Sequence, residues 1–167
     1  MTQIERIEDA TRVPVQWRPF FLGGVFKATG NAAPALVPSR GKHMVTDLMR
    51  WAERYNVPMR FPSRFPMNTL PAMRALLGVE DEERGRLSLA LGHAYWAEDA
   101  DLSDPAVLND IMGAEAVARA AEFKDALRAN TDEAVSRGAF GAPTFFVDDQ
   151  MFFGNDRIDF VIDAALS

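Results

Sequence analysis

The sequence predicts an α/β domain interrupted by an all-helical insertion. β-forming segments occur only near the two ends of the chain, at Val13–Phe20 and in the run PTFFVDDQMFFGN. Between them, residues 42–129 carry apolar side chains at helical spacing. Strands at both ends with helices between them are typical of one domain split by an insertion. We therefore expect residues 1–41 and 130–167 to form one discontinuous domain and residues 42–129 to form the insertion.

The N-terminal part predicts a helix, a strand and a long loop. Residues 2–11 place Ile4 and Ile7 on one face of a helix. Val13–Phe20 alternates in polarity and holds β-forming residues, and its two prolines favour a position at the edge of a sheet. Phe21–Gly41 is rich in glycine and proline, so it is predicted to be a loop, and loops of this length inside a compact domain tend to be functional.

The middle of the chain predicts a series of helices from apolar periodicity and capping residues. These helices are expected over Lys42–Tyr55, from Asn68 or Thr69 to Leu77, over Asp81–Glu98, from Asp104 to Gly113 and over Ala114–Ala129. The pair Asp104-Pro105 offers an N-cap followed by proline at the first helical position. Asn130 with Glu133 resembles a capping box, which predicts a further helix that ends at Gly138.

The C-terminal segment predicts a β-hairpin and a last helix. PTFFVDDQMFFGN contains two short strand patterns around an Asp-Asp-Gln turn. Asn155 or Asp156 can cap the helix that follows, which has an apolar stripe. Because Ala142-Pro143 stands directly before a strand, its peptide bond is a candidate for the cis form, and an ordinary trans proline that starts an edge strand is the alternative.

Composition and charge exclude several functional classes. The chain has no cysteine, which excludes disulfides, thiolate metal sites and a protein thiol for thiol-disulfide exchange. A net charge of -6 argues against nucleic acid as the main partner. No apolar run approaches membrane-spanning length, and the first residues lack the apolar region of a signal peptide, so we expect a cytoplasmic protein. His43 and Asp47 have the spacing of two metal ligands, but without a third ligand we expect no metal.

The two halves of the chain differ in charge. Residues 1–64 carry ten lysines and arginines against five acids, whereas residues 65–167 carry eight against nineteen. Val13–Thr46 holds no acid at all and includes Lys27 among its four basic side chains. This excess of positive charge suits a small anionic ligand, and a solvated charged face is the alternative.

Three short segments could together bind a small zwitterionic or anionic ligand. The backbone of Ala142 could pair with an extended peptide. Asn155 and Asp156 at a helix start could hold the carboxylate and the ammonium of an amino acid, or they could simply cap the helix. Lys27 offers a point charge and Asn31 offers donors and acceptors, in what could also be a flexible surface loop.

The segments RPFFLGGVFKATGN, FPMNTLPAMRALL and GAFGAPTFFVDDQMFFGNDR follow one another in this order. In this respect the sequence resembles the 2-hydroxychromene-2-carboxylate isomerase family, which is related to kappa-class glutathione transferases and to DsbA-type proteins. The resemblance implies a thioredoxin-like domain interrupted by a helical insertion, with Pro143 in the cis form. Members of this family carry a first strand followed by a serine-proline turn. By this resemblance, we expect neither feature to have a counterpart in this sequence.

The family resemblance further implies glutathione as the cofactor. The Ala142 backbone would pair with its cysteinyl part, and Asn155 and Asp156 would hold its γ-glutamyl part. Lys27 and Asn31 would lie beside the glutathione and a small anionic aromatic substrate.

The implied reaction is a glutathione-dependent isomerisation of a bicyclic aromatic acid, carried out by a homodimer. A kappa-like transferase or peroxidase is one alternative. A glutathione-binding module without catalysis is another.

Overall fold

A computed structural model describes residues 2–167, which divide into two compact units. One unit consists of the chain up to Asn31 and from Leu127 onward, and the other is Ala32–Ala126. The predicted domain limits, at residues 41 and 130, stay a prediction. Each unit is described by itself below.

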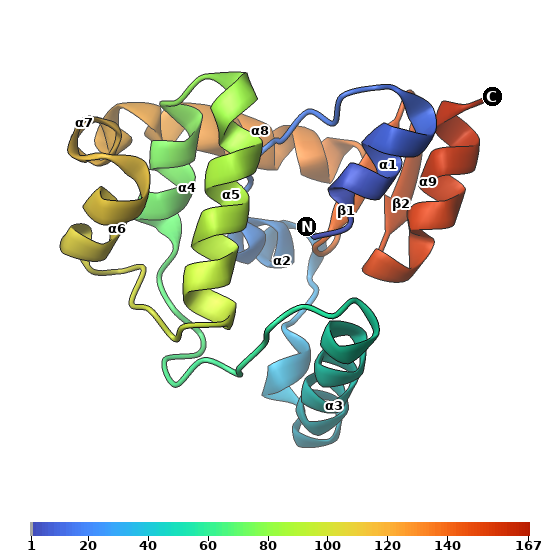
Figure 1. Ribbon diagram of the computed structural model, residues 1–167, viewed down its shortest axis with the longest axis horizontal. Coiled ribbons are helices and arrows are strands. Elements are labelled where there is room, and N and C mark those ends of the chain that lie inside the picture. The colour runs from blue at the N-terminus through green and yellow to red at the C-terminus, as the bar shows by residue number, and fades with distance from the viewer. Residues whose placement is uncertain (1) are drawn as a thin grey trace. The chain divides into compact units, whose positions relative to one another are not determined.

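The first unit combines a β-hairpin with helices from both ends of the chain (Figure 1). Its elements are α1 (Ile4–Thr11), α2 (Leu22–Thr29), most of α8 (Lys124–Ser136), β1 (Thr144–Val147), β2 (Gln150–Phe153), the 3-10 turn η3 (Asn155–Arg157) and α9 (Ile158–Ala165). The strands are antiparallel, with Thr144 opposite Phe153 and Val147 opposite Gln150. The hairpin and the last helix are therefore confirmed, but the predicted cap is wrong, because Asn155 and Asp156 lie in η3 and Arg157 precedes α9.

A small hydrophobic core holds α1 and α9 against the hairpin. Ile4 and Ile7 of α1 are buried with Ile158 and Val161 of α9. Side chains of both strands, including Phe145, pack against this cluster. The predicted apolar faces of the first and last helices are thus the faces that the structure buries.

The prediction of a strand at Val13–Phe20 is wrong. This segment pairs with no strand, and the sheet found among residues 2–167 contains only β1 and β2. Its two prolines have no N–H to donate to a ladder. The backbone N–H of Val15 donates instead to the Glu8 carboxylate at 2.8 Å. The segment still contributes to the core, because Val15 and Trp17 pack against the cluster of α1 and α9.

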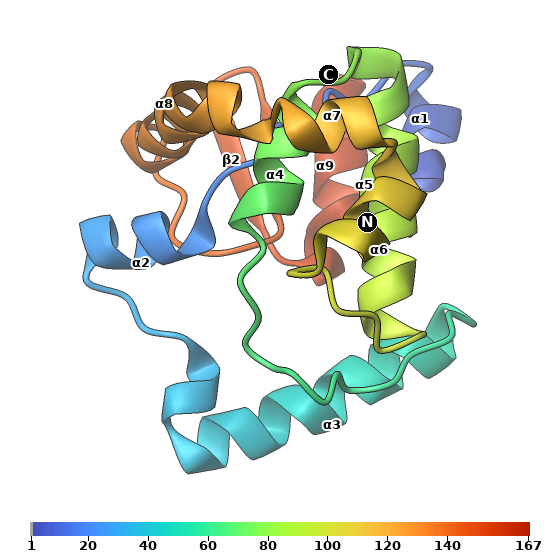
Figure 2. The ribbon, with the colours of Figure 1, turned by 90° about the vertical axis from the view of Figure 1, so that its left-hand side faces the viewer.

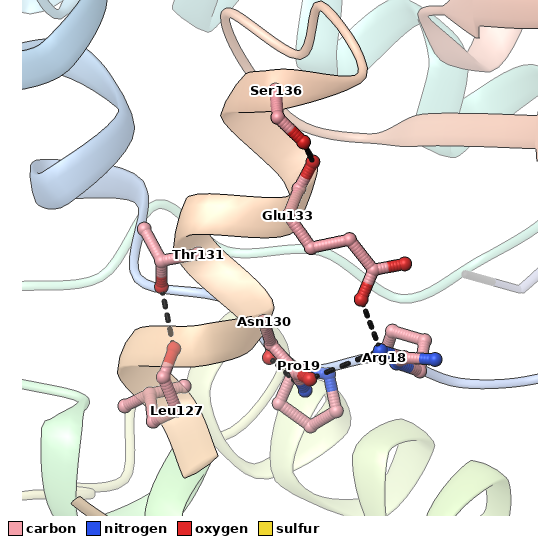
Figure 3. Close-up of polar contacts among 7 residues, drawn as sticks. All are labelled: Arg18, Pro19, Leu127, Asn130, Thr131, Glu133 and Ser136. Atoms are coloured by element: carbon pink, nitrogen blue, oxygen red, sulfur yellow. Dashed lines mark hydrogen bonds and ion pairs between the residues drawn. The ribbon is translucent and has the colours of Figure 1, made fainter. Parts of the chain in front are cut away.

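Polar side chains of α8 hold the end of this segment in place (Figure 3). The Asn130 amide donates to the carbonyl of Pro19 at 3.0 Å and accepts from the Arg18 guanidinium at 3.2 Å. Arg18 also forms an ion pair with Glu133. Asn130 and Glu133 therefore lie inside α8 rather than in a capping box, so the predicted helix start at Asn130 is wrong.

Thr131 makes the most buried of these polar contacts. Its hydroxyl accepts from the N–H of Phe21 at 3.0 Å and donates to the Leu127 carbonyl at 2.7 Å. Replacement by valine keeps the shape but leaves the Phe21 N–H without an acceptor, so Thr131→Val is expected to lower the free energy of unfolding by about 1–2 kcal/mol. Urea denaturation measures the change.

Thr46 supplies a matched control for that variant. It also bonds the carbonyl four residues earlier in a helix, with 3.1 Å between Oγ1 and the Lys42 oxygen, but it is exposed. Thr46→Val is expected to change stability by less than about 0.5 kcal/mol. Equal losses in the two variants would show that the bond to Phe21 contributes nothing.

The prediction of a continuous loop over Phe21–Gly41 is also wrong. The segment contains α2, the 3-10 turn η1 (Pro34–Leu36) and the start of α3 (Pro38–Arg54). Two glycines in α2 allow close packing: a Cβ on Gly23 would come within 2.7 Å of the Phe21 ring, and one on Gly24 within 3.0 Å of the Thr131 methyl. Val25, which follows Gly24 in α2, is fully buried.

The second unit is helical (Figure 2). It contains η1, α3 (Pro38–Arg54), α4 (Leu70–Leu77), α5 (Asp81–Trp96), α6 (Pro105–Met112), α7 (Ala114–Ala118) and the 3-10 turn η2 (Ala120–Phe123). Its core lies between α4, α5, α6 and η2 and includes Leu76, Leu91 and Leu108. The Asp104 carboxylate caps α6, as predicted, by accepting from the Ala106 N–H at 2.8 Å.

One predicted helix of this region is divided. Ala114–Ala129 was expected to be continuous, but it forms α7, η2 and the start of α8. The break at η2 turns Phe123 toward Gly78, where a Cβ would come within 2.7 Å of the ring. Tertiary packing therefore overrides a sequence with good helix propensity. Within residues 2–167, no helix has the length and apolar character needed to cross a lipid bilayer.

Candidate functional site

The site is built around the residues that lead into the hairpin. Ala142 and Pro143 are exposed and precede β1, and the peptide bond between them is cis. The Pro143 carbonyl accepts from the N–H of Gly154 at 3.0 Å, which ties the start of β1 to the end of β2. Within the described chain, the N–H and carbonyl of Ala142 have no hydrogen-bond partner. An exposed backbone with unpaired groups can pair with an extended peptide.

The turn after β2 brings a carboxylate to the same place. Gly154 has φ 109° and leads into η3, which contains Asn155 and Asp156. Asn155 is half-buried and Asp156 is exposed. The Asp156 carboxylate accepts from the Arg157 guanidinium at 2.7 Å through one oxygen, Oδ2. Its other oxygen, Oδ1, would lie 2.5 Å from a Cβ built on Gly154.

The end of α2 is joined to this site by a side-chain hydrogen bond. Asn31 follows α2 after Gly30, and its amide donates to the carbonyl of Phe140 at 2.9 Å. The Phe140 ring packs against the ring of Phe153 at a tilt of 47°, with 4.5 Å between their centroids. Asn31 is thereby held next to the segment that carries Ala142.

The structure therefore links most of the residues predicted for the site. Asn31, the Ala142–Pro143 pair and the turn after β2 are connected through Phe140 and through the bond between Gly154 and Pro143. Lys27 is exposed, one helical turn before Asn31 in α2. The functional roles of these residues stay predictions. The arrangement offers an unpaired peptide backbone, a carboxylate that can hold an ammonium, and a lysine that can attract an anion.

Sequence reasoning missed three neighbours of the site. Phe140 and Phe153 form an exposed aromatic pair, and Arg157 pairs with Asp156. Gly141, between Phe140 and Ala142, is the sequence feature that could have indicated the pair. A Cβ at this position would come within 2.7 Å of the Phe153 ring, so the ring requires a glycine there. Among residues 2–167, no group of three or more histidine, aspartate or glutamate side chains could hold a metal ion.

The pKa values that depart most from their usual range belong to the helical unit. Asp99 lies after α5 with its side chain 13% exposed. Its pKa is lowered by hydrogen bonds from the N–H and then the hydroxyl of Ser63, at 2.7 and 3.0 Å, and by the charge of Arg60. Burial, and then the charge of Asp99, raise the pKa of Tyr95.

Asp101, in the same loop as Asp99, also has a lowered pKa. The pKa of Asp101 is lowered by hydrogen bonds from the hydroxyl and the N–H of Ser103, and by the charge of Arg64. Arg60 and Arg64 belong to two Arg-Phe-Pro triplets, and both phenylalanines lie next to the Trp96 ring. The two aspartates therefore fasten residues 60–66 to the end of α5, which is a structural role.

These aspartates predict how stability depends on pH. A carboxylate with a lowered pKa in the folded state stabilises the fold above its unfolded pKa, about 3.9, and this contribution is lost as the pH falls through the folded value. We expect Asp99→Asn to lower the urea midpoint at pH 7, with a difference from the original chain that shrinks steadily below about pH 4. The exposed Asp110→Asn is the control, and a difference for Asp99→Asn that stays constant with pH would contradict this role.

Comparison with known proteins shows the family to which the chain belongs. The family model of the DSBA-like thioredoxin domain matches residues 1–165. The 2-hydroxychromene-2-carboxylate isomerase of Sphingobium xenophagum is 33% identical over 158 residues, which cover 88% of this chain and 80% of that protein. Glutathione S-transferase kappa 2 of Caenorhabditis elegans is 30% identical over 189 residues, covering 96% and 82%.

A solved structure shows the same fold. The structure of a 2-hydroxychromene-2-carboxylate isomerase superposes with a TM-score of 0.84 at 21% sequence identity, and the match covers 98% of this chain and 85% of the other. The predicted thioredoxin-like fold is therefore confirmed.

Proposed function

We infer the function from the family of the chain, because the chain belongs to the DSBA-like thioredoxin domain family and is related to 2-hydroxychromene-2-carboxylate isomerases and kappa-class glutathione transferases. We propose that it is a glutathione-dependent isomerase of a bicyclic aromatic acid. The reaction would convert a 2-hydroxychromene-2-carboxylate into a trans-o-hydroxybenzylidenepyruvate. The single observation that carries the proposal is the exposed, unpaired backbone of Ala142, tied through Pro143 and Gly154 to the Asp156 turn.

The residues of the site fit a γ-glutamyl peptide. The N–H and carbonyl of Ala142 would pair with the cysteinyl unit, because an extended peptide bonds best to an unpaired extended backbone. Asp156 would hold the α-ammonium of the γ-glutamyl unit, and Asn155 would bond its carboxylate. Bound glutathione supplies a thiolate that can add to the substrate and leave again unchanged.

Lys27 and Asn31 act on the substrate side in this proposal. The Lys27 ammonium would attract the substrate carboxylate and stabilise negative charge that develops on its carbonyl oxygen. Asn31, held by its bond to Phe140, would orient the substrate beside it. The acid-free stretch around these residues favours an anionic substrate.

A spectrophotometric assay with the purified chain tests the activity. We expect the ultraviolet absorbance of 2-hydroxychromene-2-carboxylate to change with time only when glutathione is present. Conjugation of a haloaromatic electrophile to glutathione, with no isomerisation, would favour the kappa-class transferase instead, a reading supported by relatives 30% identical over more than 90% of the chain. Binding of glutathione without either reaction would assign a binding role, and absence of binding would refute the proposal.

Replacing Asp156 tests the γ-glutamyl position. Asp156→Asn removes the negative charge with little change of shape, so the dissociation constant for glutathione is expected to rise about fivefold to tenfold. Isothermal titration calorimetry measures the constant. Asp163→Asn, an exposed residue of α9, is the matched control and is expected to leave it unchanged. An unchanged constant in Asp156→Asn would place the ammonium elsewhere.

The domain limits at residues 41 and 130 are a proposal that rests on the order of strands and helices in the sequence, and a homodimer is a proposal that rests on the family resemblance alone. Light scattering after size-exclusion chromatography measures the mass of the assembly. We expect twice the 18.5 kDa of the chain.

A further inference from the structure

The exposed aromatic pair beside Ala142 is the strongest unassigned feature of the first unit. Phe140 and Phe153 are 39% and 40% exposed, although their ring centroids are only 4.5 Å apart. Other large apolar side chains of the unit are exposed too, such as Phe160 on α9 at 57%. Phe160 lacks a ring partner among the described residues, so the Phe140–Phe153 pair differs from ordinary exposed side chains.

Three contacts fix the aromatic pair where it is. The carbonyl of Phe140 accepts the Asn31 amide at 2.9 Å, and Phe153 ends a paired strand opposite Thr144. The Phe153 ring also covers Gly141, where a Cβ would come within 2.7 Å of it. The two rings are therefore held in position before any ligand arrives, which lowers the entropy cost of binding.

The position of the pair along the chain indicates its ligand. Phe140 is two residues before Ala142, and Phe153 directly precedes Gly154, which bonds Pro143. In the proposed function Ala142 pairs with the cysteinyl unit of glutathione, so the cysteine sulfur and any group attached to it would come near these residues. A flat aromatic group would stack on the exposed rings, whereas a small aliphatic group would leave them in water.

We propose that Phe140 and Phe153 form the site for the aromatic partner of the glutathione sulfur. This inference rests on the proposed function and deepens it, because it names the residues that select an aromatic substrate. It predicts that specificity for the aromatic group depends on the two rings, while affinity for the peptide part depends on Ala142 and Asp156.

S-substituted glutathiones test this site without any need for turnover. Calorimetry would compare S-benzylglutathione with S-methylglutathione, and we expect the benzyl compound to bind about fivefold to tenfold more tightly. Phe153→Leu and Phe140→Leu are each expected to remove most of that preference and to leave the affinity for S-methylglutathione unchanged. Phe160→Leu, on α9, is the matched control and is expected to keep the preference.

The outcomes separate this inference from the proposed function. If the chain binds both compounds with equal affinity, or if Phe153→Leu and Phe140→Leu keep the benzyl preference, the aromatic site is wrong and glutathione binding stands. If neither compound binds at millimolar concentration, the proposed function fails and this inference fails with it. Loss of affinity for both compounds in the leucine variants would also overturn it, because the rings would then serve the peptide part.

Discussion

Replacing Gly154 by alanine is expected to reduce glutathione affinity more than tenfold and to lower the free energy of unfolding by roughly 1–3 kcal/mol. Gly154 has φ 109° and ψ 149°, a conformation that residues with a Cβ rarely adopt. The added methyl group would also come within 2.5 Å of the Asp156 carboxylate. The turn must therefore move, and with it the carboxylate proposed to hold the ammonium of glutathione.

Gly30 is the matched control for this variant. It also has a positive φ, of 68°, but a Cβ there meets nothing within 4 Å. Residues with a Cβ can adopt this left-handed helical region at a cost of about 1–2 kcal/mol. Gly30→Ala is therefore expected to lower the free energy of unfolding by that amount and to leave glutathione affinity nearly unchanged. Calorimetry and urea denaturation of both variants make the comparison. Equal glutathione affinity in the two variants would show that the turn at Gly154 does not position the ligand.

Arg84→Met is expected to have the largest effect on the stability of the helical unit, about 2–3 kcal/mol. The Arg84 side chain is 9% exposed. Its guanidinium donates to the carbonyl of Leu76 at 2.8 Å and to that of Val79 at 2.9 Å, and it pairs with Asp81. These carbonyls lie where α4 ends, where a helix has no partners of its own for its last acceptors. Methionine fills a similar volume but leaves the carbonyls without a donor.

Arg86 provides the control because it lies on the same helix with a similar partner. It pairs with Glu83 at 3.0 Å, but its side chain is 66% exposed. Exposed ion pairs of this kind contribute little, so Arg86→Met is expected to change stability by less than about 0.5 kcal/mol. Urea denaturation followed by circular dichroism measures both variants. A loss in Arg84→Met no greater than that in Arg86→Met would contradict the role of the buried guanidinium.

Elements with strong local signals could be predicted from the sequence. Helix α6 begins with the Asp104 cap and proline and ends before Gly113, and the hairpin turns at Asp148 and Asp149. These signals depend on neighbouring residues only. The glycines of α2 were misleading, because Gly23 and Gly24 serve close packing against Phe21 and Thr131, and that requirement is visible only in three dimensions.

The same limit applies to the extended segment and to the site. Val13–Phe20 has the composition of a strand, but an acceptor side chain from α1 and a donor side chain from α8 take the place of a ladder. The bond between Asn31 and Phe140 joins residues 109 positions apart, so no local pattern could predict it. The roles of Asn31, Ala142 and Asp156 were therefore predicted through family resemblance, whereas the aromatic pair required the structure.

An amide NMR titration tests most directly whether glutathione lies along the residues before β1. In spectra of the ¹⁵N-labelled chain, added glutathione is expected to shift the amide signals of Ala142, Asn155 and Asp156 most strongly. Amides of the helical unit, such as that of Leu108, should stay in place. Saturating shifts that leave Ala142 and Asp156 unmoved, or no shifts at millimolar glutathione, would contradict the proposed binding mode.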